Sequence, residues 1–324
     1  MKAVRYHEFG GPEVLRWEDV PDPEVRPNEV LIRVEAAGVN FADLMRRQGR
    51  YHSHEGFPAG VGTEAAGTLV RVGDKVTEFK PGDRVFCRRS TPGCQAEMVA
   101  VPASETFLMP ETCSFTEAAA IPVIFLTAYH LLKTLAPLRS GETVLIHAAA
   151  SGVGTAAVQL GKLWGARVFA TASTDDKLAL AKRLGADECI NYARQDFLAE
   201  VLARTGNQGV DRVLECVGGD VLLKSVKALA PGGRLMIYGR ASGTLPPLPP
   251  EELFAKNLQI MGLNIGGPPW HAAEHRAALN ECVALIAAGS VRPVISATFK
   301  MAEVAAAHDY LGQRKTMGKV VLIH

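Results

Sequence analysis

The amino-acid sequence predicts an α/β protein in which a doubly wound parallel sheet accompanies a second domain of the β-barrel type. Three observations lead to this fold class. From residue 143 onward, apolar strands alternate with helical segments of about 10–15 residues, which is typical of right-handed βαβ units. Before residue 123, short β-type segments recur about every ten residues between Pro and Gly clusters, which favours a barrel. The length of 324 residues is enough for about two domains.

Composition and charge argue against several classes of partner. The chain carries 35 Lys and Arg against 34 Asp and Glu, so its net charge of +1 offers no attraction to nucleic acid or a membrane surface. The first residues lack the apolar core of a signal peptide, and the apolar stretch 118–132 is too short to cross a bilayer. The six cysteines include no Cys-x-x-Cys pair, which is typical of reduced, buried thiols. We therefore expect a cytoplasmic protein.

The first domain is expected over residues 1–122. Its β-strands are predicted at 1–6, 15–20, 30–37, 65–72, 84–86 and 96–100. A helix is expected to begin near Phe41, and the segment 115–132 is expected to be a helix that leads into the second domain.

The second domain, expected over residues 123–265, opens with an apolar strand, a turn of small residues and a helix. In this turn, the three positions of a Gly-x-Gly-x-x-Gly fingerprint hold Ala149, Ser151 and Gly154. Small residues let backbone N–H groups at the start of a helix approach a pyrophosphate. The segments that follow are predicted as strands at 167–172, 187–190, 210–217 and 233–239 and as helices at 174–184, at 195–204 and before the last strand.

These strands and helices predict a nucleotide site at the carboxyl edge of the sheet. A degenerate fingerprint on the first turn of a parallel sheet is typical of such a site. The turns at 218–219 and 239–243 each follow a strand, so they are expected on the same edge.

The end of the second strand bears on which dinucleotide binds. Where NAD-binding sheets usually carry an acidic residue for the ribose, this chain has Ser173 and Thr174, with Lys177 one helical turn later. Hydroxyl groups and a cation suit a 2′-phosphate, and Tyr192 is placed to cover the adenine or to reach the same phosphate, so the pattern favours NADPH. Two alternatives stay open: Asp175 or Asp176 binds the ribose of NADH, or Ser173 or Thr174 caps the helix.

The chain is expected to return to the first domain after the parallel sheet. An apolar strand is predicted at 258–265 and an amphipathic helix at 270–288. An extended segment at 291–300, a helix at 301–311 and a strand at 319–323 close the chain. Residues from about 266 to 324 would then complete the first domain.

Motifs spread over the whole chain carry a resemblance to a known family. They lie at 10–15 (Gly-Gly-Pro-Glu-Val-Leu), 39–43 (Val-Asn-Phe-Ala-Asp), 43–51, 72–85, 118–131, 151–154 and 318–321 (Gly-Lys-Val-Val). In these motifs the chain resembles the zinc-free medium-chain dehydrogenases/reductases of the quinone oxidoreductase, or ζ-crystallin-like, group. The resemblance implies a GroES-like catalytic domain, a Rossmann domain that binds NADPH, and oxidoreductase activity.

Zinc-dependent members of the wider family provide a test for a metal. By alignment, their catalytic zinc ligands correspond here to Asn40, Thr63 and Val123, which provide neither thiolate nor imidazole. The lobe that carries a structural zinc is also missing, and Cys87 and Cys94 are an unrelated pair. We therefore expect no metal, and acceptors that take hydride without a Lewis acid: quinones, or C=C bonds conjugated to a carbonyl.

The resemblance also implies site residues, in a substrate pocket between the domains. It suggests catalytic roles for Asn40, Asp43 and Tyr51, although Asp43 is equally well placed to cap the helix beginning near Phe41. The residues expected to contact the cofactor are Asn40, Thr127, Ser151, Gly152, Val153, Gly154, Ser173, Lys177, Tyr192, Val217, Gly239, Ala241, Asn264 and Lys319.

Two further motifs are interpreted as coincidental. Tyr129 and Lys133 match the Tyr-x-x-x-Lys pair of short-chain dehydrogenases, but there the Gly-rich turn precedes the pair and here it follows. His52 and His54 share a loop flanked by Gly and Pro, where solvated histidines are more common than metal ligands.

Three functions stay open on this basis. The first is reduction of a quinone by NADPH, and the second is NADPH-dependent reduction of an enone, enal or enoyl thioester. The third is an NADPH-binding protein of slight activity with a structural or RNA-binding role, against which the balanced charge argues. The apolar segment 258–265 resembles the edge strand through which relatives form homodimers.

Overall fold

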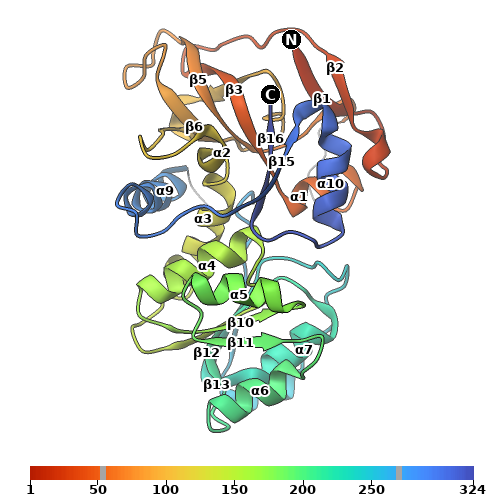
Figure 1. The fold of residues 1–324 in the computed structure, drawn as a ribbon, viewed down its shortest axis with the longest axis vertical. Coiled ribbons are helices and arrows are strands. Elements are labelled where there is room, and N and C mark those ends of the chain that lie inside the picture. Colours follow the sequence, from red (N-terminus) through yellow and green to blue (C-terminus); the bar gives the residue numbers. More distant parts are fainter. Residues whose placement is uncertain (52–55, 268–271) are drawn as a thin grey trace. The chain divides into compact units, whose positions relative to one another are not determined.

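The chain folds into two compact units. The computed structural model describes residues 1–51, 56–267 and 272–324. The first unit comprises Met1–Ile124 and His271–His324, and the second comprises Phe125–Trp270 (Figure 1). The two ends of the chain, red and blue in Figure 1, therefore belong to the same unit.

The first unit is built on two β-sheets. In the larger one the described strands follow the order β15-β16-β3-β5-β6-β8, and β7 pairs with β3. Its strands are β3 (Glu29–Val39), β5 (Glu64–Val72), β6 (Arg84–Arg88), β7 (Met98–Pro102), β8 (Thr106–Leu108), β15 (Ile295–Lys300) and β16 (Lys319–Ile323). The smaller sheet, β2-β1-β4, contains β1 (Lys2–Tyr6), β2 (Arg16–Asp19) and β4 (Ala59–Gly60).

The long strand β3 is central to the larger sheet, because it pairs with β16, β5 and β7. Its first half alternates buried and partly exposed residues, as expected for a strand with one face toward the core. Its last four residues, 36–39, are all buried, and three of them are Ala or Gly. These small residues let neighbouring elements approach both faces of the strand where it leads into the first helix.

Capping side chains mark the start of two helices of the first unit, α1 and α2. Asn40 is the N-cap of α1, and Asp43 closes a capping box by accepting the backbone N–H of Asn40 at 2.8 Å. Ser114 and Glu117 make the same arrangement at α2. The helices of this unit are α1 (Phe41–Arg47), α2 (Phe115–Ala118), α9 (Ala272–Ala287) and α10 (Val304–Gly312).

The continuous helix predicted at 115–132 is wrong. The segment forms α2, then α3 (Pro122–Tyr129), then a π-helix at His130–Thr134. Pro122 explains the first break, because proline has no N–H to extend the preceding helix but is well tolerated at the first helical position.

The second unit contains a six-stranded parallel sheet in the described residues, with the order β11-β10-β9-β12-β13-β14. The strands are β9 (Thr143–Ile146), β10 (Arg167–Ala172), β11 (Glu188–Asn191), β12 (Val210–Glu215), β13 (Leu229–Ile237) and β14 (Gln259–Gly262). The helices are α4 (Gly152–Leu163), α5 (Asp175–Arg183), α6 (Phe197–Arg204), α7 (Gly219–Ala228) and α8 (Pro250–Lys256). Figure 1 shows α4 and α5 on one face of this sheet, and α6 and α7 on the other.

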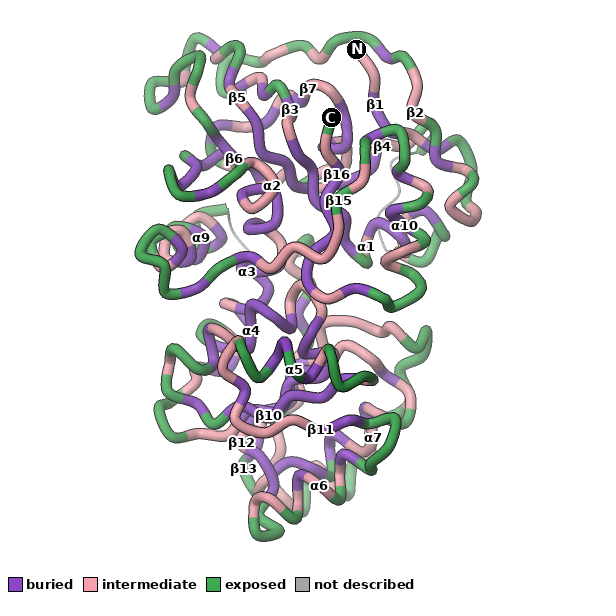
Figure 2. Tube along the Cα trace, viewed as in Figure 1, coloured by how far each residue is buried: buried purple, intermediate pink, exposed green. Residues whose placement is uncertain are grey.

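This strand order confirms the predicted doubly wound sheet. The chain starts at β9, winds outward through β10 to β11, and then returns to place β12 on the other side of β9. The direction of winding therefore reverses between β9 and β12, and ligands of open α/β sheets bind at such a switch point, beyond the carboxyl ends of the strands. Figure 2 shows buried residues concentrated along the strands.

Several details of the second unit differ from the prediction, since the strands predicted at 233–239 and 258–265 are observed at Leu229–Ile237 and Gln259–Gly262. The strand predicted at 210–217 ends at Glu215, whose carboxylate accepts the backbone N–H of Val217 at 2.7 Å and so turns the chain. Helix α8 was not predicted, although it has a proline at its start and Glu251 and Glu252 in its first turn, both typical of helix N-termini.

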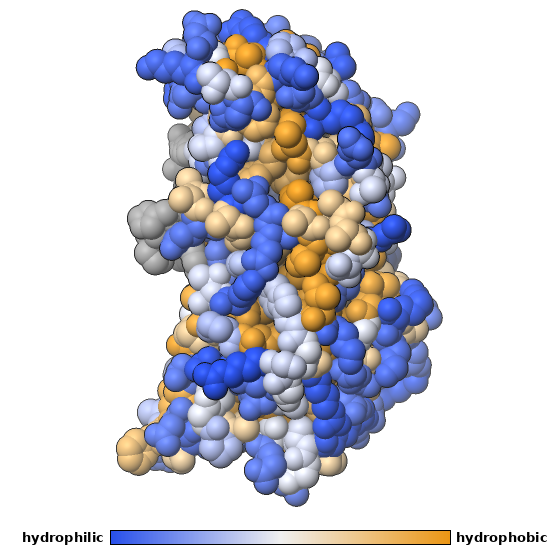
Figure 3. Space-filling model, turned by 90° about the vertical axis from the view of Figure 1, so that its left-hand side faces the viewer, coloured by the Kyte–Doolittle hydropathy of each residue, from blue (hydrophilic) through white to orange (hydrophobic). Residues whose placement is uncertain are grey.

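The described helices include none that is both long and apolar enough to cross a membrane. Figure 3 shows hydrophilic residues over much of the drawn surface, with apolar residues among them. The cytoplasmic location stays a prediction.

Candidate active site

The turn between β9 and α4 has the geometry of a phosphate-binding turn. Ser151 is the N-cap of α4, and its Oγ accepts the backbone N–H of Gly154 at 3.1 Å. A Cβ on Gly154 would clash with the carbonyl oxygen of Ala148 and lie 2.7 Å from the carbonyl carbon of Ala149. Only glycine lets the backbone close so tightly here. The N–H groups of Gly152 and Val153 belong to the first helical turn, where intrahelical acceptors are lacking and anions bind well.

A second turn lies at the carboxyl end of β12, across the switch point. The buried Glu215 carboxylate accepts the N–H groups of Val217 at 2.7 Å and Gly218 at 3.1 Å. Burial raises the pKa of Glu215, and these two hydrogen bonds act in the opposite direction. Gly218 has a φ of 79°, which favours glycine.

The loop after β13 lies against this turn. The N–H of Ala241 donates to the carbonyl of Cys216 at 2.9 Å, and the N–H of Ser242 donates to that of Val217 at 2.7 Å. A Cβ on Gly239 would lie 3.0 Å from the Cys216 carbonyl oxygen. The structure thus brings the predicted residues Val217, Gly239 and Ala241 together. Asn264, also predicted, follows β14, and its Oδ1 accepts the N–H of Gly266 at 3.0 Å.

The residues predicted to select the dinucleotide meet at the ends of β10 and β11. The register pairs Ala172 with Asn191, so the residues that follow them, Ser173 and Tyr192, are neighbours. Tyr192 is 48% exposed. Thr174 is confirmed as the N-cap of α5, since its side chain accepts the N–H of Lys177 at 3.4 Å.

Asp175 is already engaged by other side chains. One carboxylate oxygen accepts from Asn191 Nδ2 at 2.7 Å and the other from Arg194 Nη1 at 2.8 Å. These bonds compete with a ribose for the carboxylate. They also place Arg194, which sequence reasoning missed, beside Asp175 in the first turn of α5, the helix that carries Lys177.

In the first unit, Asn40, Glu64 and Lys319 form a buried polar cluster. Lys319 Nζ lies 2.5 Å from Glu64 Oε1 and also donates to Asn40 Oδ1. Asn40 Nδ2 donates to the same Glu64 oxygen at 2.7 Å. All three residues are at most 8% exposed. The registers explain the meeting: Val320 pairs with Val39 and Ala37 pairs with Ala65, so the ends of three adjacent strands coincide.

Backbone groups complete the surroundings of Glu64. Its other oxygen, Oε2, accepts the N–H of Val123 in the first turn of α3 at 2.8 Å. A Cβ on Gly38 would lie 2.7 Å from the Glu64 carboxyl carbon, so glycine at that position leaves the room that the side chain needs. Sequence reasoning missed Glu64, although it directly follows Thr63, one of the aligned metal-ligand positions.

Asp43 and Tyr51 adjoin this cluster through Arg46. Asp43 Oδ1 lies 3.6 Å from Arg46 Nη1, and its side chain is 1% exposed. Burial raises the pKa of Asp43, while Arg46 and the Asn40 N–H act in the opposite direction. The Arg46 guanidinium lies 4.4 Å from the centroid of the Tyr51 ring. The predicted site residues of the first unit thus occur in one region, with Lys319 buried among them.

Comparison with known proteins identifies the same two kinds of domain, one GroES-like and one dehydrogenase-like. Residues 26–111 match the model of the alcohol dehydrogenase GroES-like domain, and residues 152–289 match that of the zinc-binding dehydrogenases. A quinone oxidoreductase of Rattus norvegicus is 34% identical over 100% of this chain and 98% of its own, and one of Pseudomonas aeruginosa is 36% identical over 99% of both. This chain belongs to the quinone oxidoreductase family.

Other relatives extend the comparison. The crystal structure of Escherichia coli quinone oxidoreductase complexed with NADPH has a TM-score of 0.94 and 32% identity, and each chain is covered over 100% of its length. A 2-haloacrylate reductase of a Burkholderia species is 36% identical over 99% of this chain and 98% of its own. The recognised group, the GroES-like and Rossmann fold class and oxidoreductase activity are thereby confirmed.

The residues present in this family member do not fit a catalytic zinc. Asn40, Thr63 and Val123 offer an amide, a hydroxyl and an aliphatic side chain where zinc needs thiolate or imidazole. The neighbouring Glu64 carboxylate is already paired with the Lys319 ammonium, whose charge would repel a cation. In the described ranges, His, Cys, Asp and Glu form no group of three or more suited to a metal. His52 and His54 lie outside the described residues.

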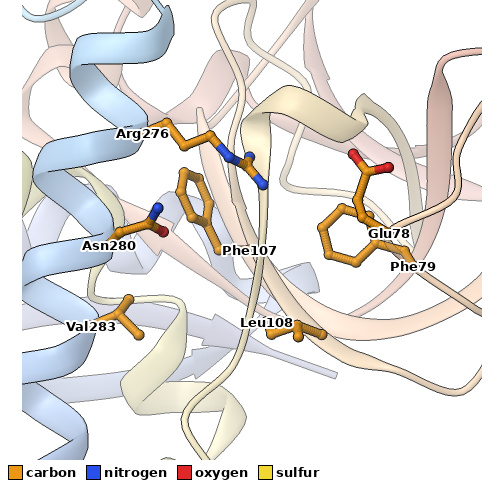
Figure 4. A pocket seen from close by; sticks show the side chains of 7 residues that line it. All are labelled: Glu78, Phe79, Phe107, Leu108, Arg276, Asn280 and Val283. Atoms are coloured by element: carbon orange, nitrogen blue, oxygen red, sulfur yellow. The ribbon is translucent and has the colours of Figure 1, made fainter.

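Two remaining features involve none of the predicted site residues. Lys133 Nζ lies 5.2 Å from the Tyr129 ring centroid and 5.4 Å from that of Trp164, so the Tyr-x-x-x-Lys pair is a cation–π contact. Within the first unit, α9 and β8 border a cavity of about 280 Å³. Figure 4 shows Arg276 extending over Phe107 at its rim, and the lining contains none of the predicted site residues.

Proposed function

We propose that this protein is an NADPH-dependent quinone oxidoreductase that transfers hydride without a metal. The observation that carries the proposal is the Asn40–Glu64–Lys319 cluster, which places an amide and an ion pair where zinc-dependent relatives hold their metal. The acceptor must then accept hydride without Lewis-acid help, as a quinone does, because its product is an aromatic hydroquinone. Positioning and hydrogen bonding carry the catalysis.

The second unit offers the residues to hold the cofactor. The N–H groups of Gly152 and Val153 suit the pyrophosphate. Ser173, Lys177 and Tyr192, together with Arg194, suit a 2′-phosphate, and the other bonds of Asp175 disfavour NADH. Further cofactor contacts are proposed for Thr127, Val217, Gly239, Ala241 and Asn264. When bound, NADPH supplies the hydride.

The first unit offers the residues to hold the acceptor. We assign Asn40 as a hydrogen-bond donor to the oxygen that gains negative charge, because its amide is fixed and lies at the edge of the cluster. Tyr51 provides an aromatic surface for a ring acceptor and a hydroxyl group. Arg46, stacked on Tyr51, adds positive charge on that side. The proton needed by the product comes from solvent or from Tyr51.

Steady-state kinetics tests this function. We expect oxidation of NADPH by 9,10-phenanthrenequinone, with kcat/KM for NADPH at least about tenfold above that for NADH. Lys177→Met should raise KM for NADPH about tenfold and leave KM for NADH unchanged, because only NADPH carries the 2′-phosphate. The proposal would be refuted if NADPH neither raised the Tm of the protein nor was oxidised by it in the presence of quinones.

A second candidate function is reduction of a conjugated C=C bond. The Burkholderia relative, named a 2-haloacrylate reductase, favours it. The same donors would then stabilise an enolate oxygen. A kcat/KM for 2-cyclohexen-1-one above that for the quinone would replace the first function by this one.

We also propose a homodimer formed through β14. This strand ends the parallel sheet, so one of its edges offers backbone hydrogen-bonding groups, and such edges favour pairing with another strand. Phe254 in α8, five residues before β14 begins, is 87% exposed and gives a second apolar element for a partner copy to cover.

A further inference from the structure

The side-chain amide of Asn40 is held between groups of opposite hydrogen-bonding character. An ammonium group only donates hydrogen bonds, and a carboxylate only accepts them. Lys319 faces Asn40 Oδ1, and Glu64 faces Asn40 Nδ2 at 2.7 Å. Rotating the amide by 180° would place its oxygen against the carboxylate, where both groups are acceptors, and its NH₂ group against the ammonium, where both are donors. The pair therefore allows one amide orientation.

This orientation leaves one N–H of Asn40 for another purpose. Nδ2 carries two hydrogens, and one of them is donated to Glu64. Within the part of the chain that the structure describes, the second has no acceptor. Asn40 is 8% exposed, against 0% for Glu64 and 3% for Lys319, so of the three residues Asn40 lies nearest the surface of the cluster.

Stability alone does not explain the ion pair. Burying two charges costs solvation free energy, and replacing a buried pair by neutral side chains is often neutral or stabilising. Glu64 also serves two donors at once, Asn40 Nδ2 and the Val123 N–H, through different oxygens. A glutamine offers a single acceptor oxygen and cannot satisfy both. The carboxylate is thus specifically matched to the fixed amide.

We infer that Glu64 and Lys319 are positioning residues for the reaction. They hold the second N–H of Asn40 toward the acceptor oxygen, on which negative charge develops as hydride arrives. Because their charges cancel, they orient this donor without adding net charge to the site. A donor fixed in advance needs no reorganisation during the reaction and stabilises the transition state more than a mobile one. The inference rests on the proposed function.

The test is a cycle of variants measured with NADPH and 9,10-phenanthrenequinone. Asn40→Ala removes the donor, and Glu64→Gln/Lys319→Met removes both charges together, so that neither is left buried alone. Each is expected to lower kcat about 10- to 100-fold, with the Kd for NADPH changed less than about threefold. Because the pair acts through Asn40, the triple variant should be no slower than Asn40→Ala.

A matched control is available in the second unit. Arg212 and Glu142 form another largely buried pair, with Nη2 to Oε2 at 2.7 Å. Arg212→Met/Glu142→Gln should change Tm without changing kcat. The inference would be overturned if the loss of kcat in the triple variant equalled the product of the losses in Asn40→Ala and in the double variant. A raised Kd for NADPH with unchanged kcat would also overturn it. An inactive wild-type protein would instead refute the proposed function itself.

A structure of the wild-type protein with NADPH and a bound quinone decides the matter if the double variant does not fold. The inference requires Asn40 Nδ2 within hydrogen-bond distance, below about 3.2 Å, of a quinone oxygen. A water molecule or a cofactor hydroxyl accepting that hydrogen in place of the quinone would overturn it.

Discussion

Gly154 is a residue at which backbone geometry and ligand binding coincide. Its Cα faces the carbonyl groups of Ala148 and Ala149 across the turn, with no room for a Cβ. Gly161, two helical turns later in α4, differs, because a Cβ there would lie 3.4 Å from Val168 Cγ2, close to ordinary van der Waals contact. Alanine substitutions at these two glycines therefore distinguish a change in the turn from a change in the helix.

Gly154→Ala is expected to raise the Kd for NADPH at least about tenfold, because the turn must open and its N–H groups move. Gly161→Ala should leave the Kd unchanged and alter stability by less than about 1 kcal/mol, since alanine favours helix. Fluorescence titration with NADPH measures the first quantity and urea unfolding the second. Equal Kd values for the two variants would contradict the assignment of the turn.

Two buried histidines make stability depend on pH. His147 hydrogen-bonds Thr171 Oγ1 at 2.9 Å and Ser225 Oγ at 2.8 Å, and burial lowers its pKa to about 3. His308 is also buried, and burial together with Arg47 lowers its pKa to about 3. Both rings are therefore neutral in the folded protein at pH values where an unfolded histidine is protonated.

The sign of the effect follows from proton binding. Between the unfolded pKa near 6.5 and the folded value of about 3, the unfolded state binds more protons. The free energy of unfolding should thus fall on acidification by up to about 1.4 kcal/mol per pH unit for each histidine. His308→Leu should remove one of these two contributions. Urea unfolding between pH 7 and pH 5 measures the slope, and an unchanged slope in the variant would disprove the contribution of His308.

At the level of elements, α1 depends on a reciprocal cap. The Asp43 carboxylate accepts the N–H of Asn40, and the helix begins immediately after that residue. The sequence left Asp43 between a catalytic and a capping role. The structure shows the cap, and the catalytic role stays a prediction.

Asp43→Asn decides between the two roles. Asparagine keeps an acceptor oxygen for the Asn40 N–H, so kcat should stay within about threefold of wild type if Asp43 only caps the helix. Asp43→Ala removes the acceptor and should lower the free energy of unfolding by about 1 kcal/mol. A large loss of kcat in Asp43→Asn at unchanged stability would favour the catalytic role.

Sequence patterns located most elements, and the exceptions have local causes. The alternation of strands and helices from Thr143 onward predicted the parallel sheet. It could be recognised because apolar residues recur with a different spacing along a buried strand than along a helix. Apolar composition alone did not reveal that Pro122 starts a new helix. Helix α8 was missed because its start lies among prolines that also fit a loop.

At the level of the whole molecule, the edge strand β14 predicts the state of assembly. Gln259 and Met261 project to the same side of the strand, opposite to Ile260, which packs against the core of the second unit. Gln259→Lys/Met261→Lys would bring lysines together in a symmetric pair of edge strands, and lysine is a residue that blocks such pairing.

Analytical ultracentrifugation should show about twice the mass of one chain for the wild type, and one chain for Gln259→Lys/Met261→Lys. The exposed substitution Gln208→Lys, remote in sequence, should leave the dimer intact and controls for added charge. A dimeric double variant would exclude β14 as the interface, and a monomeric wild type would exclude the dimer.

The order of residues within single segments was enough to show which chemistry each segment can provide. The small-residue turn after β9 indicated a phosphate site, and the residues at the aligned zinc-ligand positions argued against a metal. Both conclusions depend on neighbouring residues or on the identity of single residues. For the same reason Ser173, Lys177 and Tyr192 were identified as a group before their strands were paired.

The ion pair that Glu64 and Lys319 form around Asn40 became evident from the three-dimensional fold alone. These residues lie in strands far apart in the chain, and they meet because β16 and β5 pair with opposite edges of β3 in a particular register. A local pattern carries no information on register between distant strands. Lys319, which the sequence predicted to contact the cofactor, forms an ion pair with Glu64. A buried ammonium group is stable when a carboxylate pairs with it.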